Sequence, residues 1–129
     1  MSDDEEIRRI ANEARADFEA GTIPEAQLVQ LYGDYCPAVD ANMFVAAARV
    51  LFPAGNCGLA SLYLQFQLQG GEVAYGTYAR KGHTFWHMGS LIVDITSDQY
   101  GGPKVYVGPL VEPWSLQAPD SAYAFKHHR

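Results

Sequence analysis

The sequence predicts an α+β domain in which N-terminal helices are followed by a small antiparallel sheet. Apolar residues recur at helical spacing up to about residue 69, and at a spacing of two residues after it. The 129 residues, 48% of them hydrophobic and 19% charged, suffice for one core without disulfides or a structural metal. We therefore expect a single domain over residues 1–129. Residues 1–52 are expected to form a helical cover, 53–108 a helix and the sheet, and 109–129 a C-terminal loop and tail.

Four helices are expected, over residues 3–20, 24–33, 40–51 and 57–69. Acidic residues open the first, and Gly21 ends it. Pro24 suits the first position of the second helix, Gly33 its end, and Asp40 the N-cap of the third. The fourth helix carries an apolar stripe of Leu59, Leu62, Tyr63 and Phe66.

Four strands are expected, over residues 73–78, 83–88, 91–95 and 105–108. Gly82 separates the first two, and Gly89-Ser90 is typical of a two-residue type II′ turn between the second and third. After Pro109 the chain is expected to be mostly loop, with some aromatic packing from Trp114.

Composition excludes several classes of function. A net charge of −6 argues against a nucleic-acid partner, and no apolar run approaches the roughly 20 residues that span a membrane. The acidic start differs from a secretory signal, so a cytoplasmic location is expected. Two cysteines are too few for a disulfide framework or a structural zinc site. His127 and His128 are interpreted as an unstructured polar terminus rather than a metal site.

Cys57 is the candidate nucleophile. It follows Asn56, a good N-cap, so the thiol is expected in the first turn of a helix, where the helix dipole favours a thiolate. Cys36 lacks this setting because Pro37 follows it and no helix start precedes it closely. The alternative is that Cys57 is a small buried apolar residue, as most free cysteines are.

The predicted hairpin brings polar residues together. A two-residue turn places Phe85 opposite Asp94 and His87 opposite Ile92, so that His83 and His87 share the sheet face of Asp94. Both histidines are then diagonal neighbours of the carboxylate, which is the arrangement that orients a general base. The alternative is a buried polar cluster in which Asp94 satisfies a histidine.

The stretches NCGLAS, residues 56–61, and GHTFWHMGSLIVDITSDQY, residues 82–100, resemble cysteine enzymes of the papain-like and transglutaminase-like superfamily. Those enzymes have Cys, His and Asp in this chain order, with the cysteine at a helix start and the other two on adjacent strands. The resemblance implies that fold, with Cys57 as nucleophile, His83 as base and Asp94 as the residue that orients the base.

The sequence departs from the family in several places. The loop between His83 and Asp94 is short, and Leu51 stands where papain has its oxyanion glutamine, so the Cys57 N–H would need another donor beside it. His87 competes with His83 for the role of base. We prefer His83 because Phe85 then occupies the family's aromatic position and because His87 lies close to the turn.

We expect a cysteine-dependent hydrolase or acyltransferase that acts on an amide bond: a peptidase, a glutamine deamidase or a transglutaminase. A protein or peptide substrate is expected, and no cofactor. One alternative is a non-catalytic binding module with a papain-like fold. A less favoured one is a metal-dependent hydrolase that uses His83, His87 and Asp94.

Overall fold

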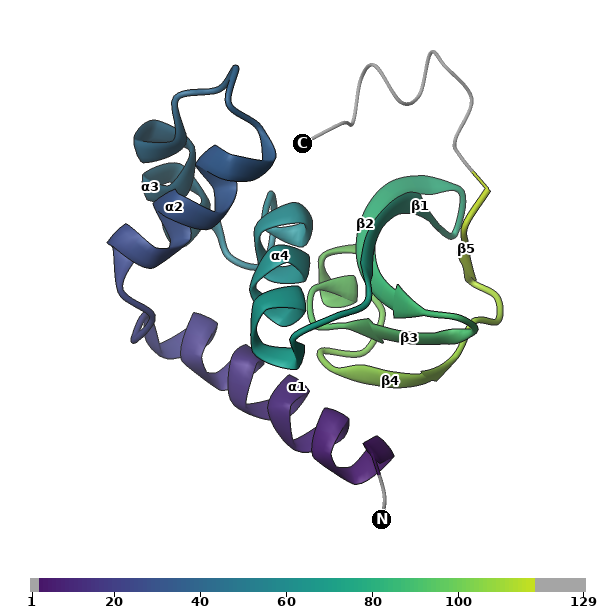
Figure 1. Cartoon of the computed structure of the whole chain (residues 1–129). Helices are drawn as coiled ribbons and strands as arrows, with labels where there is room; N and C mark the ends of the chain where they lie inside the picture. Colours follow the sequence, from purple (N-terminus) through teal and green to yellow (C-terminus); the bar gives the residue numbers. More distant parts are fainter. Residues whose placement is uncertain (1–2, 118–129) are drawn as a thin grey trace.

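A computed structural model describes residues 3–117 of the chain (Figure 1). The helices are α1 (Asp3–Ala20), α2 (Glu25–Tyr35), α3 (Ala41–Leu51) and α4 (Cys57–Leu68). The strands are β1 (Glu72–Tyr78), β2 (Lys81–Met88), β3 (Leu91–Asp94), β4 (Tyr106–Pro109) and β5 (Trp114–Ser115), with a 3-10 turn, η1 (Ser97–Tyr100), between β3 and β4. The strands form one curled antiparallel sheet in the order β4-β3-β2-β1-β5. The predicted α+β class is confirmed.

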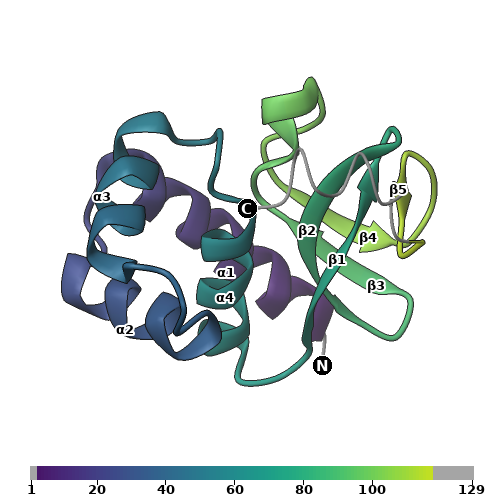
Figure 2. The ribbon, with the colours of Figure 1, turned by 90° about the horizontal axis from the view of Figure 1, so that it is seen from above.

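Helix α4 lies at the centre, between the other helices and the sheet (Figure 2). Its first two turns, residues 57–64, are buried on every side, as an all-round apolar sequence requires. The predicted stripe is therefore wrong in two respects. Leu64 is buried although it lies outside the stripe, and Phe66 is 52% exposed because the last turns of α4 leave the core.

The helix boundaries follow local signals at most ends. The Asp40 side chain caps α3 by accepting a hydrogen bond from the Met43 N–H at 3.2 Å. Helix α2 continues through Gly33, the predicted end, to Tyr35, because a glycine inside a helix costs only about 1 kcal/mol and packing outweighs it.

The hairpin between β2 and β3 has the predicted register, with His87 opposite Ile92 and a positive φ of 60° at Gly89. The turn between β1 and β2 was predicted wrongly. It lies at Ala79-Arg80, where both residues have positive φ, and β2 begins at Lys81, so that Gly82 lies within the strand.

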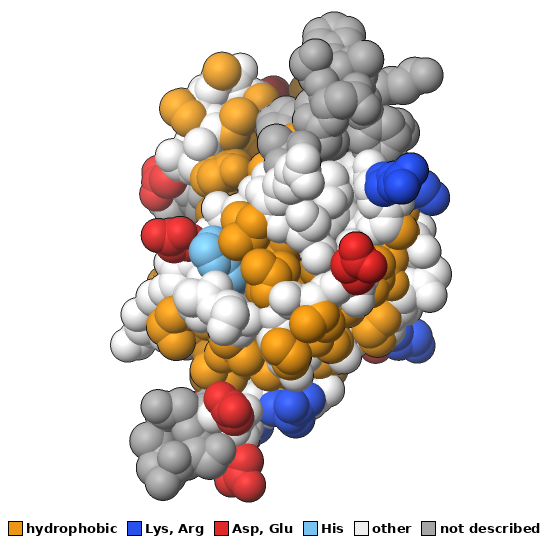
Figure 3. All heavy atoms as spheres, turned by 90° about the vertical axis from the view of Figure 1, so that its right-hand side faces the viewer, with side chains coloured by type: hydrophobic (Ala, Val, Ile, Leu, Met, Phe, Trp, Pro, Cys, Tyr) orange, Lys and Arg blue, Asp and Glu red, His pale blue; other side chains and the backbone are white. Residues whose placement is uncertain are grey.

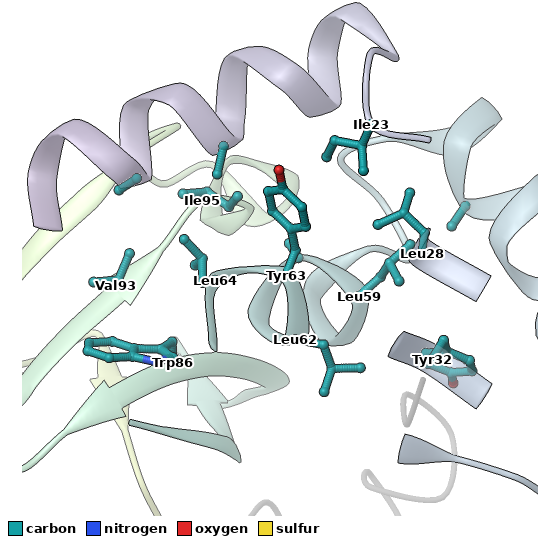
Figure 4. Packing of buried hydrophobic residues seen from close by; sticks show 14 of the residues in the cluster. Ile23, Leu28, Tyr32, Leu59, Leu62, Tyr63, Leu64, Trp86, Val93 and Ile95 are labelled. Carbon is teal, nitrogen blue, oxygen red and sulfur yellow. The ribbon is translucent and has the colours of Figure 1, made fainter. Parts of the chain in front are cut away.

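The two faces of the sheet carry different side chains. Trp86 and Val93 point toward the helices and join the main core (Figure 4). Phe85 and Ile92, one position away on each strand, belong to a second cluster on the other face together with Tyr78, and Trp114 closes that cluster from β5. The region after Pro109, expected to be mostly loop, thus contributes a short strand, in which Trp114 pairs with Tyr78.

Helix α1 is anchored to the segment that follows β3. Arg15 makes two hydrogen bonds to the Asp98 carboxylate, at 2.7 and 2.8 Å, and one to the Ile95 carbonyl at 2.9 Å. Its guanidinium is nearly buried, so these bonds fix the chain immediately after Asp94.

The outer surface on the sheet side mixes apolar side chains with scattered acidic and basic ones (Figure 3). Over residues 3–117, no helix has both the length and the apolar character needed to cross a membrane.

Candidate active site

Cys57 is the first residue of α4 and is 6% exposed. Asn56 occupies the N-cap position, as expected, but its side chain does not cap the helix. Its amide Nδ2 donates instead to the carbonyls of Ala48, at 2.7 Å, and Ala54, at 3.0 Å. Asn56 therefore holds the α3–α4 connection and so fixes where α4 begins.

Ser61 holds this first turn against β2. Its hydroxyl lies 2.7 Å from the Cys57 carbonyl and 3.3 Å from the Thr84 carbonyl, and Ser61 is itself buried. Because Thr84 directly follows His83, this contact places the start of α4 beside the histidine. Neither role was predicted: Asn56 suggests a helix cap rather than a loop anchor, and the Ser61 contact joins residues 23 positions apart.

His83 and Asp94 form a buried pair. The imidazole Nε2 lies 2.7 Å from Asp94 Oδ2, and both side chains are at most 1% exposed. Of the two histidines predicted beside Asp94, His83 is confirmed there, and the prediction for His87 is wrong. His87 turns away toward the turn and the edge of the sheet, with Nδ1 3.2 Å from the Gly89 carbonyl and Nε2 3.3 Å from Glu72.

Two further residues donate hydrogen bonds to the Asp94 carboxylate. The Thr96 N–H donates to Oδ1 at 2.9 Å, and the Trp114 indole N–H donates to Oδ2 at 2.7 Å. A buried carboxylate needs such donors, and a buried indole needs an acceptor. The sequence shows a carboxylate that needs donors and an indole that needs an acceptor, but no local pattern pairs residue 114 with residue 94.

The imidazole lies close enough to the thiol to change its pKa. Because Asp94 occupies Nε2, Nδ1 is the ring nitrogen left to face Cys57, and no partner among the described residues, the thiol included, meets hydrogen-bond geometry with it. Burial raises the pKa of Cys57, but the neighbouring His83, together with Thr84, outweighs burial and lowers the pKa.

The pKa of His83 moves in the opposite direction. Burial lowers it, but the charge and hydrogen bond of Asp94, followed by the neighbouring Cys57, raise it to about 10. A lowered thiol pKa beside a raised imidazole pKa favours a thiolate–imidazolium pair near neutral pH.

Backbone N–H groups without an acceptor inside the helix lie at the start of α4, where Cys57 is located. The first hydrogen bond inside α4 runs from Ala60 N–H to the Asn56 carbonyl, at 2.8 Å, so the N–H groups before it, including that of Cys57, have no acceptor within the helix. Leu51, the residue that the resemblance would align with the papain glutamine, is 58% exposed and carries no side-chain donor.

The alternative metal site is not formed. His87 lies beside Glu72 rather than Asp94, and within residues 3–117 no group of three or more His, Cys, Asp or Glu residues is placed to hold an ion. His127 and His128, interpreted as a polar terminus, lie outside the described residues.

Comparison with known proteins identifies no relative: no family model, no curated protein and no solved structure matches the chain.

Proposed function

We propose that this protein is a small thiol enzyme that breaks an amide bond and transfers the acyl group to water or to an amine. The observation that carries the proposal is the buried His83, bonded through Nε2 to Asp94 at 2.7 Å while its Nδ1 is left to the thiol of Cys57 at the start of α4. A nucleophile, a base and a carboxylate that orients the base are what acyl transfer requires.

In the proposed first step, the Cys57 thiolate attacks the amide carbonyl carbon and forms a carbon–sulfur bond, and the carbonyl oxygen becomes an oxyanion. Backbone N–H groups at the start of α4 are positioned to stabilise it. The His83 imidazolium then gives the Nδ1 proton to the amide nitrogen, the carbon–nitrogen bond breaks and the amine leaves.

The thioester that remains is resolved by a second nucleophile. Water gives its proton to the now neutral His83, attacks the thioester carbon and displaces the Cys57 thiolate, releasing a carboxylic acid and restoring the imidazolium. An amine in place of water forms a new amide. A peptide-bond substrate makes the protein a peptidase. A glutamine side chain makes it a deamidase if water attacks and a transglutaminase if an amine attacks.

The papain-like and transglutaminase-like core belongs to the same proposal. It is supported by the chain order Cys57, His83, Asp94, by the cysteine at a helix start and by the two other residues on neighbouring antiparallel strands. Residues 3–52, which cover α4, and the short β2–β3 turn are departures from that core.

A non-catalytic module is the second candidate, and one observation favours it. Cys57 is only 6% exposed, whereas a nucleophile must meet its substrate. The two candidates differ in whether the sulfur becomes acylated.

Acylation is measured directly by intact mass. The protein is incubated with peptide thioesters and with glutamine-containing peptides, and quenched in acid. We expect an adduct on Cys57 that hydroxylamine removes and that is absent from Cys57→Ala. His87→Gln changes the other histidine of strand β2 and serves as the matched control, which should keep the adduct. If no peptide acylates Cys57 and none is turned over, the enzyme proposal fails and the binding module replaces it.

A further inference from the structure

We infer that Trp114 is a positioning residue of the site: its indole N–H fixes the Asp94 carboxylate so that the carboxylate in turn fixes His83. This inference rests on the proposed function and adds a residue of strand β5 to the candidate active site. The N–H donates to Oδ2 at 2.7 Å, to the same oxygen that faces His83 Nε2 at 2.7 Å.

The geometry of the carboxylate explains why this bond matters. Thr96 holds Oδ1 through its N–H at 2.9 Å and its hydroxyl at 3.5 Å, so its bonds oppose rotation of the carboxylate from one side only. The bond to His83 cannot hold Oδ2 independently, because His83 is the group being oriented. Trp114 is the donor that fixes the second oxygen from outside the Cys57–His83–Asp94 set.

The indole is itself held rigidly. It is 5% exposed, stacks on Tyr106 with ring centroids 4.0 Å apart, and meets Tyr78 edge-on at 5.1 Å. Because aromatic rings pack against the indole on two sides, its orientation is fixed, and in this orientation the N–H points at Asp94. A donor to Oδ2 also stabilises the negative charge of the carboxylate, which keeps the shared proton on His83.

The molecule provides a matched control. Trp86 is 1% exposed, and its indole N–H donates to the Gly70 carbonyl at 2.8 Å on the opposite face of the sheet. Trp86→Phe and Trp114→Phe therefore each remove one buried indole hydrogen bond, but only the second bond touches Asp94.

The test is the pH dependence of iodoacetamide labelling at Cys57, read by peptide mass spectrometry. An Asp94 carboxylate that is held less firmly stabilises the His83 imidazolium less. In Trp114→Phe we therefore expect the onset of labelling to move to a higher pH, by about one unit. We expect Trp86→Phe to keep the wild-type profile despite its lower stability. Replacing Trp114 by 3-benzothienylalanine, which keeps the ring shape but has sulfur in place of N–H, should reproduce the shift, and it serves if Trp114→Phe does not fold.

Each result has one meaning. A wild-type profile in the N–H-free variants, or an equal shift in Trp86→Phe, overturns the positioning role while leaving the proposed enzyme intact. If wild-type Cys57 itself labels only near pH 8.5, as an ordinary thiol does, the proposed function fails, and the role of Trp114 fails with it.

Discussion

The two ends of strand β2 place a histidine beside a carboxylate, and the two pairs differ in almost everything else. His83 is fully buried, 2.7 Å from an Asp94 that two other N–H groups hold in place. His87, on the same strand and four residues later, lies 3.3 Å from Glu72, whose side chain is 79% exposed.

The difference shows what turns a histidine–carboxylate pair into a functional one. At an exposed edge, water screens the pair and its geometry has little consequence. In the interior the same charges interact strongly, and the pKa of His83 rises to about 10 although burial alone would lower it. The first three predictions compare the pair at one end of β2 with the pair at the other end.

The largest effect is expected from the histidines themselves. His83→Gln removes the proton shuttle, so acylation of Cys57 should slow by about 10⁴-fold, the upper range for general acid–base catalysis. His87→Gln should keep the wild-type rate within a factor of about two, because His87 does not contact Asp94. Single-turnover acylation rates decide the matter, and a larger loss in His87→Gln would reverse the assignment of the base.

The carboxylates come next. Asp94→Asn keeps the shape of the side chain but places an amide N–H₂ against either His83 or Trp114, so we expect acylation to slow by roughly 10³-fold. Glu72→Gln should leave the rate unchanged. Equal rates in Asp94→Asn and wild type would mean that Asp94 is structural only.

Stability should separate the same two carboxylates. Asp94→Ala strands a buried imidazole and two buried donors, and should lower the free energy of unfolding by about 3–5 kcal/mol. Glu72→Ala should lower it by no more than about 0.5 kcal/mol, since the Glu72 side chain is 79% exposed. Urea unfolding followed by tryptophan fluorescence measures both. Similar losses in the two variants would contradict the contrast between the ends of β2.

The effect of pH on stability tests the ion pair. In Cys57→Ala, folded His83 keeps its proton above pH 6.5, where the unfolded chain loses it, because Asp94 still raises its pKa. The unfolded state then binds fewer protons, and the stability due to this group, fully present below about pH 6.5, falls as pH rises, by at most about 1.4 kcal/mol per unit.

The wild type should behave differently. Between about pH 6.5 and 8.5 the unfolded chain holds one proton on the thiol, and the folded chain holds one on the imidazole, so the two states bind equal numbers. Stability due to the pair should therefore stay level in this window and fall only above it. If wild type and Cys57→Ala decline in parallel from pH 6.5, the thiol is protonated in the folded protein.

Much of the site could be predicted from the sequence because its determinants are local. The Gly89-Ser90 turn sets the register of β2 and β3, and that register alone brings residues 83 and 94 together. Asn56 marks the start of α4, and hence the position of Cys57, although its side chain holds a loop rather than the helix end. Alternation could not choose between the two histidines, because the choice depends on burial, which the rest of the chain provides.

What could not be predicted involves contacts across long stretches of chain. The bond from Trp114 to Asp94 joins residues twenty positions apart through a strand of two residues, too short to give an alternating pattern. The Ala79-Arg80 turn lacks the glycine or asparagine that usually signals positive φ, so its position was assigned to Gly82 instead. Nothing in the sequence distinguishes Ser61 from other helix residues, because its contact with strand β2 exists only in the folded structure.

Cys57 is proposed to be a thiolate held by His83, and a comparison of the two cysteines of the chain tests this. Cys36 lies at the C-terminal end of α2, away from a helix start, and it is partly exposed. Iodoacetamide labelling of both residues from pH 4 to 9 should show Cys57 reacting well below pH 8.5, and faster than Cys36 in the acidic part of the range. Labelling of Cys57 no faster than Cys36 across the whole range, or only after unfolding, would contradict the account.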